Sequence, residues 1–196
     1  MIDSKFFAPF FHINIDHDVR VYEHDRLGRV LLIAKNASST LDHHISHSPQ
    51  WRKTTTRHCQ QNPSVITRAL IREPHERLIS GLGTVFSNDW NKDHSKEKLI
   101  RAIKRNQLIF DAHTWPQVMF LDLIQPDPSL WQLIPMTKGW QQQVESEWEI
   151  IVTEHQNVKE GSDLYAEIRT EVNQIKPHLI EQMLKPDLEL WQSLIE

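Results

Sequence analysis

Short apolar runs alternate with amphipathic segments along this chain. The run from Arg29 to Ala34 stops at a polar cluster, which predicts a buried strand that ends in a loop. Leu41 and Ile45 follow four residues apart, so we expect a helix that begins near Ser38 or Ser39, both good N-cap residues. This part of the chain is therefore predicted to be a strand, a polar loop and a helix in succession.

A second unit of the same kind follows. The apolar run 65–71 ends at Arg72-Glu73-Pro74, and apolar residues then return at helical spacing. Pro74 suits the first turn of a helix, where its missing N–H does no harm. Further helices are expected at 99–108, 116–121, 164–175 and 177–195, and a third strand at 130–134.

Strands that alternate with helices predict an α/β fold with a mostly parallel central sheet flanked by helices. The chain of 196 residues has the size of one compact domain, so residues 1–196 are expected to form a single domain. In such sheets ligands bind at the carboxyl ends of the strands. The loops after 29–34 and 65–71 are therefore the first candidates for a site.

The loop after the first strand contains the parts of an oxyanion site. Lys35 supplies a positive charge, and Ser38, Ser39 and Thr40 supply hydroxyl groups. The first N–H groups of the predicted helix and the helix dipole also favour an anion. The sequence contains no Gly-x-x-x-x-Gly-Lys-Ser/Thr run, so this phosphate cradle differs from a P-loop.

The loop after the second strand offers a second anion site. Arg72 follows the strand and Ser80 lies on the next predicted helix. A guanidinium group presents a planar fork of donors to phosphate oxygens, and a serine hydroxyl can complete the cage. Arg77, between them, either contacts the same phosphate or pairs with Glu73 on the helix surface. Two anion sites at neighbouring strand ends suit a nucleoside with phosphates at both ends.

These two motifs resemble the sulfotransferases that use 3'-phosphoadenosine 5'-phosphosulfate (PAPS), in particular the carbohydrate sulfotransferase branch. The segment 35–40 is similar to the 5'-phosphosulfate loop of that family, and Arg72-Glu73-Pro74 with Arg77 and Ser80 is similar to its 3'-phosphate motif. Asn36 departs from the hydrophobic residue that many members have. Weaker similarities lie at Asp111, His113, Pro116 and Gln117, at His155 to Lys159, and at Pro186 to Trp191.

The resemblance implies a P-loop-like sulfotransferase fold and the transfer of a sulfuryl group from PAPS to a hydroxyl or amine acceptor, a carbohydrate being one candidate. PAP, the 3',5'-bisphosphate, would be the product, and no metal is implied. The residues implied for donor binding are Lys35, Asn36, Ala37, Ser38, Ser39, Thr40, Arg72, Ser80 and Lys159.

Two catalytic roles follow from this chemistry. Lys35 would stabilise the negative charge that grows on the leaving phosphate oxygen, because donors aimed at developing charge are usually the largest catalytic contribution. The acceptor must also lose a proton, and histidine is the natural general base near neutral pH. His113 is the first candidate, with Asp111 to orient its ring. The competing candidates are His43, His44 and His47.

Composition limits the alternatives. The formal net charge of -4 argues against a general nucleic-acid binder, and no apolar run reaches the roughly 18 residues of a membrane span. The single cysteine, Cys59, fits a reducing, cytoplasmic setting. A metal at His43 and His47 would lack a carboxylate or cysteine at suitable spacing.

Three questions stay open from the sequence. The basic patch of Arg52, Lys53 and Arg57 either guides an anionic acceptor or is a solvated loop. The chain can instead be a non-catalytic module that binds a nucleotide or a sulfated ligand, with Lys35 and Arg72 retained. A kinase-like phosphoryl transferase is a further alternative, although the sequence contains no glycine-rich loop for it.

Overall fold

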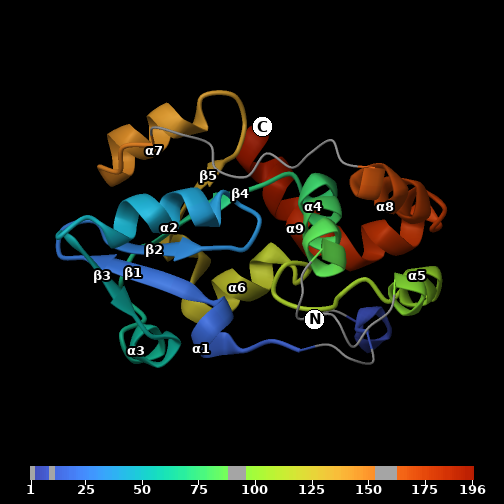
Figure 1. Cartoon of the computed structure of the whole chain (residues 1–196). Coiled ribbons are helices and arrows are strands. Elements are labelled where there is room, and N and C mark those ends of the chain that lie inside the picture. Colours follow the sequence, from blue (N-terminus) through green and yellow to red (C-terminus); the bar gives the residue numbers. More distant parts are fainter. Residues whose placement is uncertain (1–2, 9–11, 88–95, 153–162) are drawn as a thin grey trace.

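The computed structural model describes residues 3–8, 12–87, 96–152 and 163–196, and these form an α/β fold around one sheet (Figure 1). The five strands have the order β3-β1-β2-β4-β5. Their bounds are β1 (Arg20–His24), β2 (Gly28–Leu32), β3 (Trp51–Thr54), β4 (Thr67–Ile71) and β5 (Trp131–Pro135).

The sheet is mixed. Strands β2, β4 and β5 run parallel to one another, whereas β1 pairs antiparallel with both β2 and β3. The predicted α/β class is confirmed, but the expected mostly parallel sheet omitted this antiparallel part. A short turn joins β1 to β2, whose first residue, Gly28, has φ 82°. The two strands form a hairpin, and β3 pairs with the other edge of β1.

The predicted helices are present with shifted ends. The helices of the described residues are α1 (Ile15–Asp18), α2 (Ser38–Ser46), α3 (Thr56–Gln61), α4 (Pro74–Ser87), α5 (Lys96–Lys104), α6 (Gln117–Ile124), α7 (Trp140–Trp148), α8 (Asp163–Asn173) and α9 (Pro177–Ile195). Short 3-10 turns occupy Ser4–Phe6 and Pro128–Leu130. Among these described helices, none has both the length and the apolar character needed to cross a membrane.

Apolar side chains fill the space on both faces of the sheet. On one face, α2 and α7 cover Val30 and Leu32 of β2, with Trp148 fully buried between them and the strands. On the other face, α3, α4, α6 and α9 pack over Leu31 and Ala69. This alternation along β2 is the period of two expected of a strand covered on both sides. Figure 1 shows α2 and α7 together above the sheet and α6 below it.

Candidate functional site

The loop between β2 and α2 has an unusual backbone. Lys35 and Ala37 both adopt the left-handed conformation, with φ 70° and 54°. Residues other than glycine rarely do so, and such positions are concentrated at functional sites. Ala37 is the N-cap of α2 and provides no side-chain hydrogen bond to the helix. The prediction that Ser38 or Ser39 is the N-cap is therefore wrong. The N-cap is Ala37, in the left-handed conformation, and Ser38 is the first helical residue.

The first turn of α2 has the features with which a helix can bind an anion. The N–H groups at the start of a helix point out of it, where an anion can bind them, and the N–H of Leu41 donates to the carbonyl of Ala37 at 3.0 Å. Ser39 is exposed, while Ser38 and Thr40 are buried. The nine residues of α2 give it a dipole that favours negative charge at this end.

Asn36 points into the protein, with only 1% of its surface exposed. Its amide nitrogen donates to the carbonyl of Leu70, at the end of β4, at 2.7 Å and to Oε1 of Gln117 at 2.6 Å. A hydrophobic residue would make neither bond. The difference from the family pattern at Asn36 thus has a local reason, since the side chain ties the loop to its neighbouring strand.

Gln117 also binds the loop that follows β4. Its Oε1 accepts from the backbone N–H of Arg72 at 2.9 Å, and its Nε2 donates to the carbonyl of Arg72 at 2.9 Å. One buried side chain therefore holds Asn36 and both main-chain groups of Arg72. The two predicted anion loops share this single anchor.

Asp187 of α9 holds Gln117 in place. Its carboxylate accepts from the N–H groups of Gln117 and Val118, at 2.8 and 3.0 Å, which start α6. The side chain is buried, and this burial raises the pKa of Asp187 from its ordinary value, although the nearby charge of Arg77 opposes the rise. This buried carboxylate fixes the main chain at the start of α6, and its removal would leave two N–H groups without their acceptor.

Arg77 belongs to the same buried framework. It is only 2% exposed, its Nε donates to the carbonyl of Ala34 at 3.1 Å, and its Nη2 donates to the carbonyl of Ala112 at 3.4 Å. Burial lowers the pKa of Arg77 to about 10. The alternative of a surface pair with Glu73 is wrong, because Glu73 instead accepts from the N–H of Glu76 at 2.7 Å at the start of α4.

The second anion loop lies against the first. The guanidinium of Arg72 is half-buried, and its Nη1 donates to the carbonyl of Lys35 at 3.3 Å. Ser80 is on α4 and is 6% exposed. The structure therefore brings Arg72 to Lys35, as predicted for neighbouring strand ends. Lys159 lies outside the described residues.

His113 is held by a carboxylate in the way the sequence predicted. Its Nδ1 lies 3.1 Å from Oδ2 of Asp111, and its backbone N–H donates to Oδ1 of the same side chain at 2.8 Å. Asp111 is buried, whereas 30% of the His113 side chain is exposed. With the proton on Nδ1 toward Asp111, Nε2 keeps a lone pair that can accept a proton. A Cβ at Gly81 would collide with the carbonyl of His113, so α4 approaches this segment closely.

The competing histidines lie further along α2. His43 and His47 are exposed, their rings are 4.8 Å apart, and Nδ1 of His47 contacts the carbonyl of His43 at 2.6 Å. Helical rise is about 1.5 Å per residue, so His47 is more than about 10 Å along the axis from Ser38. Within the described ranges, no group of three His, Cys, Asp or Glu side chains is placed to hold a metal ion.

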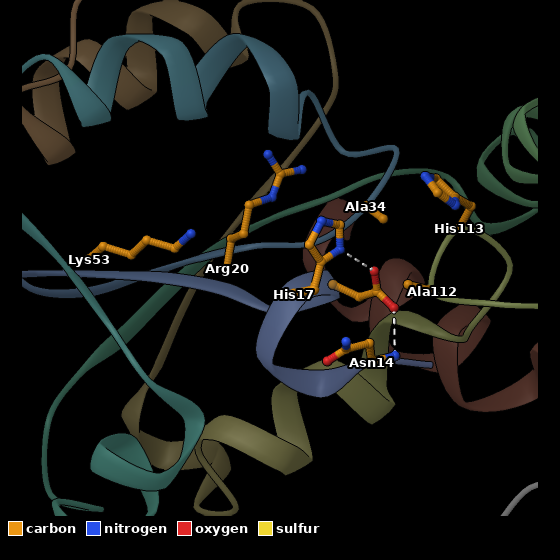
Figure 2. Close-up of a pocket in the computed structure, with 8 residues that line it drawn as sticks. Asn14, His17, Arg20, Ala34, Lys53, Ala112 and His113 are labelled. Atoms are coloured by element: carbon orange, nitrogen blue, oxygen red, sulfur yellow. Dashed lines mark hydrogen bonds and ion pairs between the residues drawn. The ribbon is translucent and has the colours of Figure 1, made fainter. Parts of the chain in front are cut away.

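An open pocket of about 460 Å³ lies beside the first anion loop (Figure 2). We call it the edge pocket. One wall comes from the α1 region, through Asn14, His17 and Asp18. The remaining lining residues are Arg20 of β1, Lys53 of β3, Ala34, Ala112 and His113. In the view of Figure 2, Lys53 and His113 lie at opposite ends, with Arg20 and His17 between them.

Sequence reasoning missed most of this pocket. It singled out Lys53 within a basic patch but gave no role to Arg20, Asn14 or His17. The available signal was the segment 20–24, in which the β-formers Val21 and Tyr22 stand between the charged residues Arg20 and Glu23. Two residues of the predicted basic patch have different surroundings. Lys53 lines the pocket, whereas Arg52 forms an ion pair with Asp25 at 2.6 Å.

Comparison of the chain with protein-family models, with curated proteins and with solved structures found no match. The class that can be stated is therefore structural. The chain is an α/β protein with a mixed five-stranded sheet, flanked by helices. At the ends of β2 and β4 it carries two joined loops with Lys35 and Arg72.

Proposed function

We propose that this protein is a sulfotransferase that moves a sulfuryl group from PAPS to a hydroxyl or amine of an acceptor. The observation that carries the proposal is the junction of the two loops: the side chain of Arg72, at the end of β4, bonds the main chain of Lys35, at the end of β2. A donor with a 5'-phosphosulfate and a 3'-phosphate needs two anion sites this close. The resemblance of both loops to sulfotransferase motifs supports the same assignment.

The donor fits the residues that are present. Its 5'-phosphosulfate would lie at the N-terminus of α2, which has no side-chain cap, against Lys35 and the hydroxyls that follow. Its 3'-phosphate would lie at Arg72 and Ser80, where a half-buried guanidinium faces the loop of Lys35. The buried side chains of Asn36 and Gln117 would keep the two sites at a fixed separation.

In the proposed reaction, the acceptor oxygen or nitrogen forms a bond to sulfur while the bond from sulfur to the 5'-phosphate oxygen breaks. Lys35 stabilises the negative charge that this leaving oxygen acquires. Nε2 of His113 takes the proton that the attacking hydroxyl or amine loses. Asp111, whose Oδ2 lies 3.1 Å from Nδ1, holds the ring and stabilises its charged form. The products are the sulfated acceptor and PAP.

The direct test is transfer of radiolabelled sulfur from PAPS to a panel of hydroxyl and amine acceptors, with labelled ATP in a parallel panel. The proposal expects labelled product from PAPS alone. Label transferred only from ATP would favour the kinase-like alternative. Tight PAP binding with no transfer to any acceptor would favour a non-catalytic binding module.

A further inference from the structure

The edge pocket lies on the opposite side of β2 from the proposed 3'-phosphate site. In the sheet, β1 borders β2 on one side and β4 borders it on the other. Arg72 follows β4, whereas the pocket includes Arg20 of β1 and Lys53 of β3. A donor held across the ends of β2 and β4 therefore leaves the edge pocket open to a second ligand.

The pocket also touches the proposed reaction centre. Ala34, at the end of β2, and His113 both line it, so its inner end adjoins the Lys35 loop and the candidate base. Arg20 reinforces this link, since its Nη1 contacts Asp42 of α2 at 2.9 Å and its Nη2 donates to the hydroxyl of Ser38 at 3.4 Å. An acceptor that enters here reaches His113 without displacing the donor.

The charges of the pocket are unequal. Among the described residues that line it, the cations are Arg20 and Lys53, and the carboxylate is Asp18. Asp18 is already engaged, because it accepts from the N–H of Asn14 at 2.8 Å and contacts His17 at 3.0 Å (Figure 2). Arg20 is likewise paired with Asp42. Lys53 has an exposed side chain at the outer end, and no hydrogen bond or ion pair is found for it within the described ranges.

We propose that the edge pocket is the acceptor site and that it selects an acceptor with a negative charge of its own, a carboxylate or a sulfate ester, besides the hydroxyl that is sulfated. This inference rests on the proposed sulfotransferase function for the identity of the reaction. The anionic group contacts Lys53 at the outer end, and the reacting hydroxyl lies at His113 at the inner end. A volume of about 460 Å³ lies in the usual range of small-ligand pockets.

Transfer in this arrangement balances as follows. The acceptor hydroxyl gives its proton to Nε2 of His113, and its oxygen forms a bond to sulfur. The bond from sulfur to the 5'-phosphate oxygen breaks, and its electron pair remains on the PAP that leaves. The acceptor's own anionic group is unchanged and stays at Lys53.

The inference is testable by binding, with simple sugar probes that carry or lack an anionic group. The full chain, saturated with PAP, is titrated with methyl β-D-glucuronide, methyl β-D-glucoside 6-sulfate and neutral methyl β-D-glucoside, and the imidazole signals are followed by NMR. We expect both anionic probes to bind at least about tenfold more tightly than the neutral probe, as a charge-assisted hydrogen bond provides. Binding should shift the signals of His113 and His17.

Two variants test whether Lys53 causes the preference for anionic probes. Lys53→Ala should lower the affinity for the anionic probes by about tenfold and change the neutral probe little. Arg52→Ala is the matched control, because it removes the same charge from the neighbouring position of β3, where the side chain pairs with Asp25 instead. It should leave all three affinities unchanged. A melting temperature equal to that of the unchanged protein, in both variants, shows that neither substitution disturbs the fold.

The outcomes separate this inference from the proposed function. Equal affinity for all three probes, no binding of either anionic probe, or the same loss in both variants would overturn the anionic acceptor site. A preference for only one anionic probe supports the site and identifies its anion. PAP binding is measured first by the shift in melting temperature, so its failure would count against the sulfotransferase proposal alone.

Discussion

The two sides of the loop between β2 and α2 are held by different means. On the β4 side, Asn36, Gln117 and Asp187 are buried and bind mainly to main-chain groups. On the β1 side, the ion pair of Arg20 and Asp42 is half-exposed, at 27% and 30% of the side-chain surfaces. The first arrangement fixes the backbone, whereas the second positions only side chains at an open edge.

This difference suits the two ligands of the proposed reaction. A donor presents its two phosphates at a constant separation, so a fixed backbone between two anion sites binds it without reorganisation. An acceptor needs contacts that discriminate between molecules, and exposed side chains such as Lys53 provide them. In the proposed reaction, the buried side would therefore fix the position of the sulfur atom, and the open side would select the acceptor.

Replacement of His113 is expected to lower turnover more than any other change and to leave donor binding intact. His113→Ala should lower kcat by about a hundred- to ten-thousandfold, the usual contribution of a positioned general base, while PAP affinity changes little. Alanine variants of His43, His44 and His47 are the matched comparison, measured in the same transfer assay. Near-normal turnover in His113→Ala together with loss in one of those three would move the base to α2.

The second prediction concerns the stability of the buried side. Asp187→Ala removes one of the two carboxylates near the buried Arg77 and the acceptor of two main-chain N–H groups, so the free energy of unfolding should fall by about 3–5 kcal/mol. Arg20→Ala on the open side should cost only about 1 kcal/mol, because its ion pair with Asp42 is half-exposed and Asp42 keeps its hydrogen bond from Tyr22. Urea unfolding measures both. Equal losses would show that the two sides are not built differently.

Lys35→Ala should depress kcat by about a hundred- to a thousandfold, because a donor aimed at the leaving oxygen acts mainly in the transition state. Its donor KM should change much less. Lys138→Ala, at an exposed position before α7, is the control with the same change of charge. An effect of Lys35→Ala on KM alone would assign Lys35 to binding instead of catalysis.

The smallest effect belongs to the second anion loop. Arg72→Ala should raise the donor KM by about ten- to a hundredfold, as expected for one charge-assisted contact to phosphate, and leave kcat nearly unchanged. Steady-state kinetics with varied PAPS measures it. A fall in kcat as large as that of Lys35→Ala would contradict separate roles for the two loops.

Local patterns predicted the elements around the site well. The strand and helix units at 29–46 and 65–87, the helix at α6 and the strand β5 lie where the apolar spacing placed them. Strands β1 and β3 were missed because they contain only two and one clearly apolar residues, and α7 was missed because Gln and Glu fill most of it. In α7 the four-residue spacing of Trp140, Val144 and Trp148 was the available signal.

The framework beneath the loops could not be predicted from such patterns. Asn36 and Gln117 are 81 residues apart, and Gln117 and Asp187 are 70 apart, so only the fold brings them together. Arg77 shows the same limit, since its spacing from Glu73 allowed a surface pair that burial excludes. The contact of Asp111 with His113 was predictable, because the two residues are near neighbours in the chain.

The central claim, that the joined loops bind a nucleoside with both a 5'- and a 3'-phosphate, is tested most directly by calorimetric titration of the protein with PAP and with AMP, which lacks the 3'-phosphate. We expect PAP to bind at least about tenfold more tightly than AMP, because Arg72 would contact the additional phosphate. PAP should also raise the melting temperature, since it binds only the folded state. Equal affinities for the two nucleotides, or no binding of PAP, would contradict it.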